Sequence, residues 1–356
     1  MINIREYEKG DEEGIVGLFN QIYHTTREVD YWKWQFIDNP LGQAVIIVAE
    51  KDSQIIGQCT LLPNKMVIKG EEVLVGESID TMISEDYRGQ GLYEKLALKS
   101  YEVGRSRGMK IRVGFPTDAL NKRLIGESIG ARFVGDIPIF INLYKLDNFL
   151  VGIVKSKVLA KILAVPSMLM AKFIYKEKKI KIKESYQIEE KQEFNEEFDL
   201  LWDKVKKDSQ IMKSRTGEFL NWRIKDHPTN DYKSFAAYLN EDLVGYIILK
   251  TEKRKVRKKV DLTVGTIIDM VGIDEDVIGA LYFKAKDYFK GIKTDFIVSW
   301  ASPTMKYRQL LIDVGFYRTK GGLPLVLKDL SHDDDLAEYI GLEDNWYLMP
   351  IESDLY

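Results

Sequence analysis

The chain repeats itself at an offset of 188 residues, and this repeat limits its possible folds more than any other feature does. Identical residues coincide in order along the chain: Trp34 with Trp222, Asp38 with Asp226, Pro40 with Pro228, Ala49 with Ala237 and Gly57 with Gly245. One inserted residue then gives Gly76 with Gly265, Ile79 with Ile268, Asp80 with Asp269, Leu92-Tyr93 with Leu281-Tyr282 and Lys95 with Lys284. A chain of 356 residues is also longer than the chains that usually fold around one hydrophobic core. We therefore expect two domains with the same fold.

Both copies predict the same order of elements. An acidic amphipathic helix (11–23; 195–207) precedes an aromatic segment that ends in Asp-x-Pro, and two strands joined by a polar turn follow (44–49 and 55–62; 234–239 and 243–250). The first copy continues with a strand over 72–82, a helix over 91–107, a strand over 110–115, a short helix and a last strand over 135–144. This alternation predicts an α/β fold with a mixed central sheet flanked by helices.

The domain boundaries follow from the repeat. We expect a first domain at 1–148, an amphipathic helical connector at 149–189, a second domain at 190–330 and a C-terminal tail at 331–356. The most apolar stretch, 149–175, contains four lysines, and its longest apolar run is too short to span a membrane. It is either a pair of helices packed between domains or an amphipathic helix on a membrane surface.

Charge and cysteine content narrow the functional classes. Lys plus Arg number 52 and Asp plus Glu 55, for a net charge of −3, which argues against a nucleic-acid partner. The one cysteine, Cys59, lies in an apolar stretch and predicts a buried inert thiol in a cytoplasmic protein. The N-terminus shows no signal-peptide pattern, and the three histidines have no metal-ligand spacing, so we expect no metal cofactor.

The segment 77–93 carries the chemistry. It predicts a strand, then the turn Arg88-Gly89-Gln90-Gly91, then a helix. The first backbone N–H groups of a helix have no intrahelical partner and, with the helix dipole, favour an anion. Glycine removes side chains that would hold a phosphate away, and Arg88 can add a charged hydrogen bond. The turn is neither a P-loop nor a GxGxxG dinucleotide turn.

The second copy serves as an internal control. There Val277 replaces Arg88, Ile278 replaces Gly89 and Ala280 replaces Gly91, while the Leu-Tyr pair remains. The anion site is therefore expected in the first copy alone. The alternative, a capped helix after a glycine turn, explains this difference poorly.

The turn resembles the acyl-CoA signature of the GNAT superfamily of N-acetyltransferases, Arg/Gln-x-x-Gly-x-Gly/Ala. Arg88-Gly89-Gln90-Gly91-Leu92 matches it, and Tyr93 departs where Gly or Ala is usual. Residues 115–117 to 128–132 resemble the segment that lines the other side of the pantetheine arm. The resemblance covers 1–148, while 190–330 looks like a degenerate GNAT domain. The pairing is similar to the enhanced-intracellular-survival acetyltransferases and mycothiol synthase.

The resemblance implies an acetyl-CoA site. Met82 and Ile83 would bind pantetheine through their backbones, and the amides of Arg88, Gly89, Gln90, Gly91, Leu92 and Tyr93 would hold the pyrophosphate. The acyl carbonyl would lie where the strands 72–82 and 110–115 splay apart. Asn121 would either touch the cofactor or cap a helix.

Acyl transfer to an amine needs a base. Glu77 stands where many GNAT enzymes have one, and its counterpart is Thr266; a surface carboxylate is the alternative. Asp80 recurs as Asp269 and favours a structural role. The usual acid tyrosine is replaced by Gly126, so Tyr93, Ser128 or the terminal carboxylate of Tyr356 could substitute.

Two surface features stay open. Tyr31, Trp32, Trp34 and Phe36 could line a substrate pocket, although the match of Trp34 to Trp222 favours a core role for Trp34. The basic run over 250–259 is either an exposed hairpin or a site for an anionic polymer or membrane.

The function implied is acetyl transfer from acetyl-CoA to the primary amine of a small polar acceptor, such as an amino sugar, with the second domain closing the substrate side. One alternative is a CoA-binding regulatory or scaffold module without catalysis. Another is a cell-wall aminoacyl transferase, which the retained Arg-Gly-Gln-Gly turn disfavours. A homodimer remains compatible with the sequence.

Overall fold

The computed structural model describes residues 1–116, 129–146, 150, 163–166, 177–256, 260–303, 305 and 307–355. These residues fall into two compact units. Unit 1 consists of Met1–Asp136, Gln210–Ser214 and Leu323–Asn345. Unit 2 consists of Ile137–Ser209, Arg215–Gly322 and Trp346–Tyr356.

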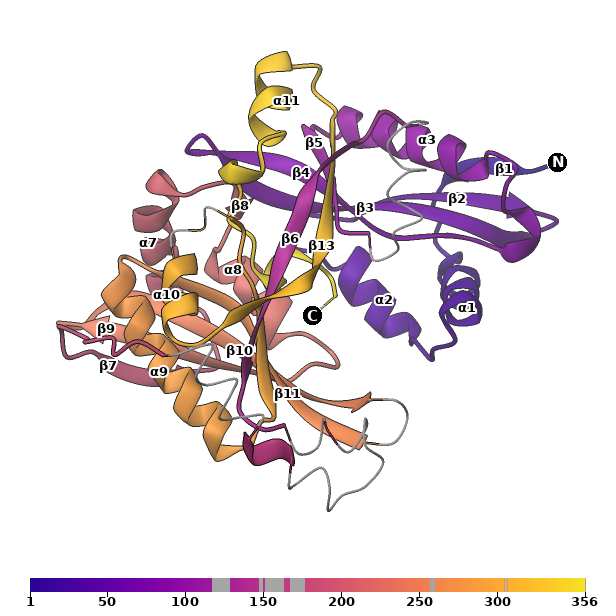
Figure 1. The fold of residues 1–356 in the computed structure, drawn as a ribbon. Helices are drawn as coiled ribbons and strands as arrows, with labels where there is room; N and C mark the ends of the chain where they lie inside the picture. Colours follow the sequence, from indigo (N-terminus) through magenta and orange to yellow (C-terminus); the bar gives the residue numbers. More distant parts are fainter. Residues whose placement is uncertain are drawn as a thin grey trace. The chain divides into compact units, whose positions relative to one another are not determined.

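Unit 1 is a twisted sheet with helices on both faces. Its strands lie in the order β1-β2-β3-β4-β5-β13, and β8 pairs with β3. The α3 helix covers one face, and α1 and α2 cover the other (Figure 1). The elements are β1 (Asn3–Glu6), α1 (Glu12–Tyr23), α2 (Val29–Phe36), β2 (Val45–Lys51), β3 (Gln54–Ile68), β4 (Glu71–Ile83), η1 (Glu85–Tyr87), α3 (Leu92–Ser106), β5 (Ile111–Gly114), β8 (Met212–Lys213), α11 (Asp334–Ile340) and η4 (Glu343–Asn345).

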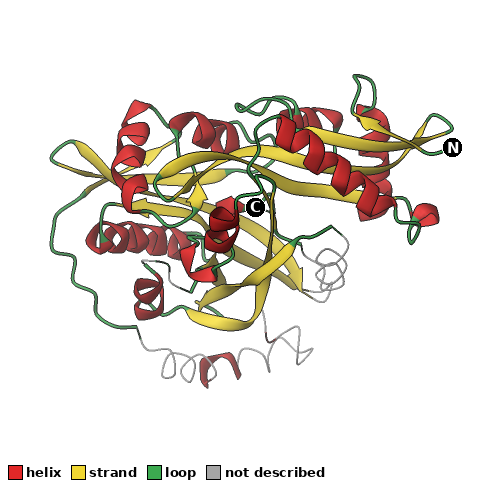
Figure 2. Cartoon of the chain, turned by 90° about the horizontal axis from the view of Figure 1, so that it is seen from above, coloured by secondary structure: helices red, strands yellow, loops and turns green. Residues whose placement is uncertain are grey.

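Unit 2 has the same arrangement. Its strands lie in the order β6-β12-β11-β10-β9-β7, and α9 packs on β9, β10 and β11. Figure 2 shows the helices of the chain in red, packed against strands in yellow. The elements are β7 (Gln187–Lys191), α7 (Glu196–Val205), η2 (Lys206–Asp208), α8 (Gly217–Leu220), the π-helical turn η3 (Asn221–Lys225), β9 (Tyr232–Leu239), β10 (Asp242–Val256), β11 (Val260–Gly272), α9 (Glu275–Gly291), β12 (Phe296–Trp300), α10 (Arg308–Asp313) and η5 (Pro350–Glu352).

Each unit receives its last strand from the other half of the sequence. In unit 2, residues 139–143 of β6 (Arg132–Leu143) pair antiparallel with β12. In unit 1, residues 326–329 of β13 (Tyr317–Asp329) pair antiparallel with β5. The predicted fold class, a GNAT-like α/β fold with a mixed sheet flanked by helices, is confirmed. The units differ from the contiguous ranges 1–148 and 190–330 because a strand's sequence does not show which sheet it joins.

The repeated glycines have a packing reason. A Cβ atom on Gly76 of β4 would lie 2.8 Å from Met109 Sδ and 2.9 Å from Leu61 Cβ. In unit 2, a Cβ atom on Gly265 would lie 2.5 Å from the ring of Phe289 on α9. Both positions thus need glycine, because neighbouring side chains lie too close for an added Cβ atom.

We expect Gly76→Ala to destabilise the protein by about 1–3 kcal/mol through overpacking. Gly17→Ala is the matched control, since Gly17 lies in α1 with nothing within 4 Å of an added Cβ. That substitution should be neutral or stabilise by up to about 1 kcal/mol. Urea unfolding measures both free energies, and equal midpoints for the two variants would contradict this explanation of the repeat.

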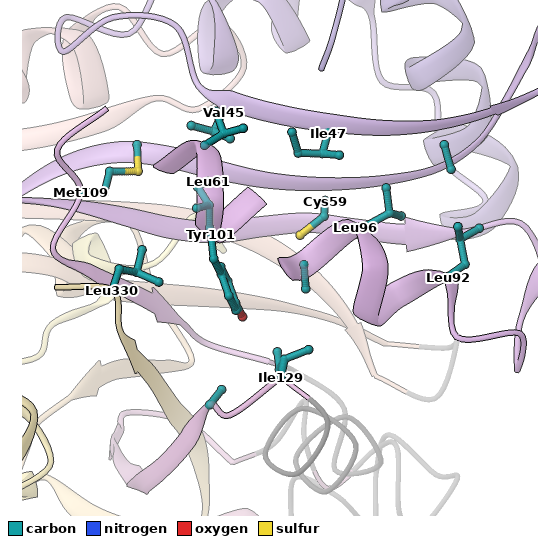
Figure 3. Close-up of a cluster of buried hydrophobic side chains, with 14 of the residues drawn as sticks. Val45, Ile47, Cys59, Leu61, Leu92, Leu96, Tyr101, Met109, Ile129 and Leu330 are labelled. Atoms are coloured by element: carbon teal, nitrogen blue, oxygen red, sulfur yellow. The ribbon is translucent and has the colours of Figure 1, made fainter. Parts of the chain in front are cut away.

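The core of unit 1 lies beneath α3. Cys59, Leu61, Leu96 and Tyr101 pack there (Figure 3). Cys59 is 2% exposed, and burial raises the pKa of its thiol, so it stays protonated and inert. The predicted buried thiol is confirmed.

The aromatic segment divides between core and surface. Trp32 and Phe36 are 1% and 0% exposed and belong to the core, whereas Tyr31 and Trp34 are half-buried, with ring centroids 5.5 Å apart. The counterpart of Trp34, Trp222, is buried. The core role therefore fits Trp222 better than Trp34.

Candidate active site

The sheet of unit 1 opens between β4 and β5. The two strands pair in parallel over three residues each: Val75–Glu77 of β4 pair with Ile111–Val113 of β5. Beyond Glu77, β4 continues to Ile83, while β5 ends at Gly114. Along that stretch, no strand of the described residues pairs with the β5-facing edge of β4. Backbone N–H and C=O groups on such an edge can pair with an incoming amide chain.

A β-bulge distorts β4 beside this gap. The register with β3 shifts between Gln58 and Thr60, and Asp80 has a φ of +47°. The Gln58 side-chain amide donates to the Asp80 carbonyl at 3.2 Å. Met82 and Ile83, the residues predicted to bind pantetheine, follow the bulge and pair with Gln58 and Gly57 on the β3 side. Their other side faces the gap.

The turn before α3 depends on glycine. Gly89 and Gly91 have φ values of +74° and +71°, a conformation that L-residues disfavour. Both glycines are exposed, and nothing lies within 4 Å of an added Cβ. Gly91 occupies the N-cap position, so no side chain caps the helix that begins at Leu92. The first amides of α3 are therefore available to an anion.

The polar side chains of the turn fold back on the chain. Arg88 Nε donates to the Ile83 carbonyl at 3.1 Å, and its Nη1 lies 3.3 Å from Glu85 Oε1. The Arg88 side chain is 52% exposed, so this ion pair is weak. Gln90 donates to the Asp86 carbonyl at 3.1 Å. The anion-binding capacity of the turn thus lies mainly in the backbone, with Arg88 as an addition.

The matching helix start in unit 2 is closed. The Asp274 side chain caps α9 by accepting from the Val277 amide at 3.0 Å. Val277 and Ile278 are 0% exposed. The segment before β7 also lies against this helix start, because the Lys183 amide donates to Asp276 at 2.9 Å. The sequence difference between the copies thus corresponds to an open and a capped helix start.

Glu77 is deeply buried. Its side chain is 1% exposed and forms an ion pair with Lys213 of β8 at 2.7 Å, and Asn64 donates to it at 3.2 Å. The surface-carboxylate alternative is therefore wrong. Lys213, itself 4% exposed, could not be found from the sequence because it is 136 residues away from Glu77. A base role for Glu77 requires a substrate or water to reach this buried position.

Asp80 forms an ion pair that both copies possess. Its carboxylate binds Arg27, whose guanidinium lies 3.5 Å from the centroid of the Phe19 ring. In unit 2, the matching Asp269 accepts from Arg215 Nε at 2.8 Å. Burial raises the pKa of Asp80, while the charge of Arg27 opposes the rise. Recurrence in the copy with the capped helix supports the structural role, and the match of Arg27 to Arg215 at the same offset was available in the sequence.

Tyr93 turns inward from the first turn of α3. Its half-buried ring packs against the core cluster that contains Leu96 and Tyr101. Burial raises the pKa of Tyr93 to about 12, partly offset by the charge of Arg112. The phenol is therefore neutral at physiological pH and can donate a proton.

Some predicted residues lie outside the described residues. These are Asn121, Gly126, Ser128, Tyr356 and most of 149–175. In the described part of the chain, no group of His, Cys, Asp and Glu side chains is arranged to hold a metal ion. No helix of that part is long and apolar enough to cross a bilayer.

Comparison with known families supports the signature around Arg88. The acetyltransferase (GNAT) domain family matches residues 3–122. The match includes the turn at Arg88 and the strand before it. No curated protein sequence matches the chain significantly.

Solved structures share the fold over most of the chain. A GCN5-related N-acetyltransferase from Anabaena variabilis ATCC 29413 has a TM-score of 0.65 at 13% identity, with 93% of this chain and 73% of that one covered. A probable N-acyltransferase from Enterococcus faecalis V583 gives 0.61 at 9% identity, with the same coverage. N-myristoyltransferase of Saccharomyces cerevisiae, solved with bound myristoyl-CoA, gives 0.60 at 12% identity over 92% of this chain and 82% of that one.

Proposed function

We propose that this protein, whose residues 3–122 match the GNAT acetyltransferase domain, transfers an acyl group from an acyl-CoA to the primary amine of a small polar acceptor, such as an amino sugar. The main support for this proposal is that α3 begins without a side-chain cap, next to the unpaired edge of β4. The amides from Arg88 to Tyr93 would bind the pyrophosphate, and the backbones of Met82 and Ile83 would bind the pantetheine. Acetyl-CoA, the donor expected from the sequence, is the reference donor for an assay.

The reaction moves one acyl group and one proton. The amine nitrogen attacks the thioester carbonyl carbon, the C–N bond forms and the C–S bond breaks. The amine loses a proton to a base, and the departing sulfur receives one. We assign the base to Glu77 and the acid to Tyr93.

A thiol-release assay tests the proposal. Acetyl-CoA is incubated with amino sugars, polyamines, aminoglycosides and peptides, and free thiol is measured over time. We expect release that depends on an amino sugar or a similar polar amine. Release with peptides alone would reject the acceptor class.

A CoA-binding module without catalysis is the second candidate. Two observations favour it: Gly126 stands where an acid tyrosine is usual, and Glu77 is held in a buried ion pair. This candidate predicts acyl-CoA binding by calorimetry with no thiol release for any amine. Absence of both binding and release would reject both functions.

Glu77→Gln tests the base directly. We expect kcat to fall by about 100-fold or more, as for loss of a general base, while the Kd for acyl-CoA stays within about twofold. The ion pair complicates this variant, because the substitution removes the negative charge with which the buried Lys213 pairs. Breaking such a pair from one side costs about 3–5 kcal/mol.

The double variant Glu77→Gln/Lys213→Met separates stability from catalysis. Removing both charges should recover most of the stability that Lys213→Met alone loses, as urea unfolding would measure. If the refolded double variant keeps wild-type kcat, Glu77 has a structural role alone.

A further inference from the structure

Arg112 is a buried cation that lacks an anion among the described residues. Its side chain is 4% exposed, Nη1 donates to the Val326 carbonyl at 3.3 Å, and Nε has no hydrogen-bond partner. No carboxylate of the described part of the chain forms an ion pair with it. Arginine cannot lose its proton, and an unpaired buried charge costs several kcal/mol. Arg215, by contrast, pairs with two carboxylates.

The guanidinium lies at the opening of the gap between β4 and β5. Arg112 is the register partner of Gly76, one residue before the last pair of these strands. Its side chain extends along β5, because a Cβ atom on Gly114 would lie 2.9 Å from Nη2 and 3.1 Å from Nη1. Gly114 is the last residue of β5, beyond the pairing with β4. The absence of a side chain there makes room for the guanidinium.

Among the described residues, the groups that surround Arg112 are cationic or neutral. Lys328 of β13 is the antiparallel register partner of Arg112, and such partners share one face of a sheet. Arg112 is also close enough to α3 for its charge to lower the pKa values of Tyr93 and Tyr101, both of which burial raises. These phenols are therefore neutral donors and do not balance the charge. Figure 3 shows the Tyr101 hydroxyl directed away from α3, towards Ile129.

We propose that Arg112 binds a carboxylate at the end of the donor's acyl group, so that the donor is a dicarboxylic acyl-CoA such as succinyl-CoA. The inference rests on the proposed function, because it places the acyl end of the donor in this gap. An acetyl group would leave the guanidinium without an anion, whereas a carboxylate would form a charge-assisted pair with it. The product amide then carries a terminal carboxylate.

Matched donors test the proposal. Succinyl-CoA and butyryl-CoA have acyl chains of four carbons, ending in a carboxylate and a methyl group. We expect the wild-type chain to bind succinyl-CoA at least tenfold more tightly by calorimetry. Arg112→Gln should reduce that ratio to about one. Arg88→Met, at the pyrophosphate turn, should weaken both donors equally and keep the ratio.

Gly114→Ala is a second variant, since its methyl group would displace the guanidinium without removing it. We expect it to lower the ratio as well. Equal binding of the two donors by the wild type overturns the proposal. So does an equal loss of affinity for both donors and for free CoA in Arg112→Gln, which would mean that the guanidinium binds a CoA phosphate. If the wild type binds no CoA species, the proposed function fails instead.

Discussion

Replacing Gly91 with glutamate is expected to abolish acyl-CoA binding while the fold survives. Gly91 is exposed at the N-cap of α3, with nothing within 4 Å of an added Cβ, so the side chain fits sterically. Its carboxylate would accept from the same amides that we propose for the pyrophosphate and would repel the phosphates. A loss of at least 100-fold in affinity corresponds to about 2.7 kcal/mol.

Backbone strain must be separated from charge in this experiment. Gly91 has a φ of +71°, so any L-residue there costs about 1–2 kcal/mol. Gly91→Gln carries the same strain and nearly the same volume without the charge. We expect calorimetry to show an intermediate affinity for Gly91→Gln and similar melting temperatures for the two variants. Wild-type affinity in Gly91→Glu would remove the site assignment.

The second large effect is expected at Arg215. Its guanidinium is 0% exposed and neutralises Asp269 and Glu352, which are also 0% exposed. Tyr246 adds a hydrogen bond to Asp269 at 2.8 Å. Arg215→Met would leave two buried carboxylates without their cation. Breaking a buried pair from one side costs about 3–5 kcal/mol, so we expect this variant to lose most of its stability.

Arg27→Met is the matched control in unit 1. Arg27 binds one carboxylate and its side chain is 14% exposed, so the loss should be clearly smaller. Urea unfolding of the two variants measures the difference. The triple variant Arg215→Met/Asp269→Asn/Glu352→Gln should recover part of the stability, because it removes both carboxylate charges together with the guanidinium. An Arg215→Met variant as stable as Arg27→Met would contradict the assignment.

The sequence predicted the parts of this molecule that depend on local pattern. The strand over 72–82 corresponds to β4, and the helix over 91–107 corresponds to α3. Gly89 and Gly91 adopt the positive φ values that glycine tolerates. Each feature depends on residues close together in the chain. The family resemblance drew on the same short segment.

The rest depends on contacts between distant residues. Lys213 pairs with Glu77 although 136 positions separate them in the sequence. In the sequence, Arg112 is an ordinary strand residue; its burial and the lack of a paired carboxylate among the described residues appear only in the structure. The exchange of the last strands could not be predicted either. The sequences of β6 and β13 do not show which of the two sheet edges each strand completes. The ion pairs of Arg27 and Arg215 could be predicted in part. The repeat aligns the two arginines and the two aspartates, but only the structure shows that each arginine pairs with its aspartate.

The exchanged strands have a consequence for synthesis on the ribosome. The edge of β5 is completed by residues 326–329, which emerge more than 200 residues after β5 itself. A nascent first half therefore has an incomplete sheet until nearly the whole chain is made, and pairings so distant in sequence form slowly. Expression of residues 1–148 alone would leave that edge bare and prone to association with other chains.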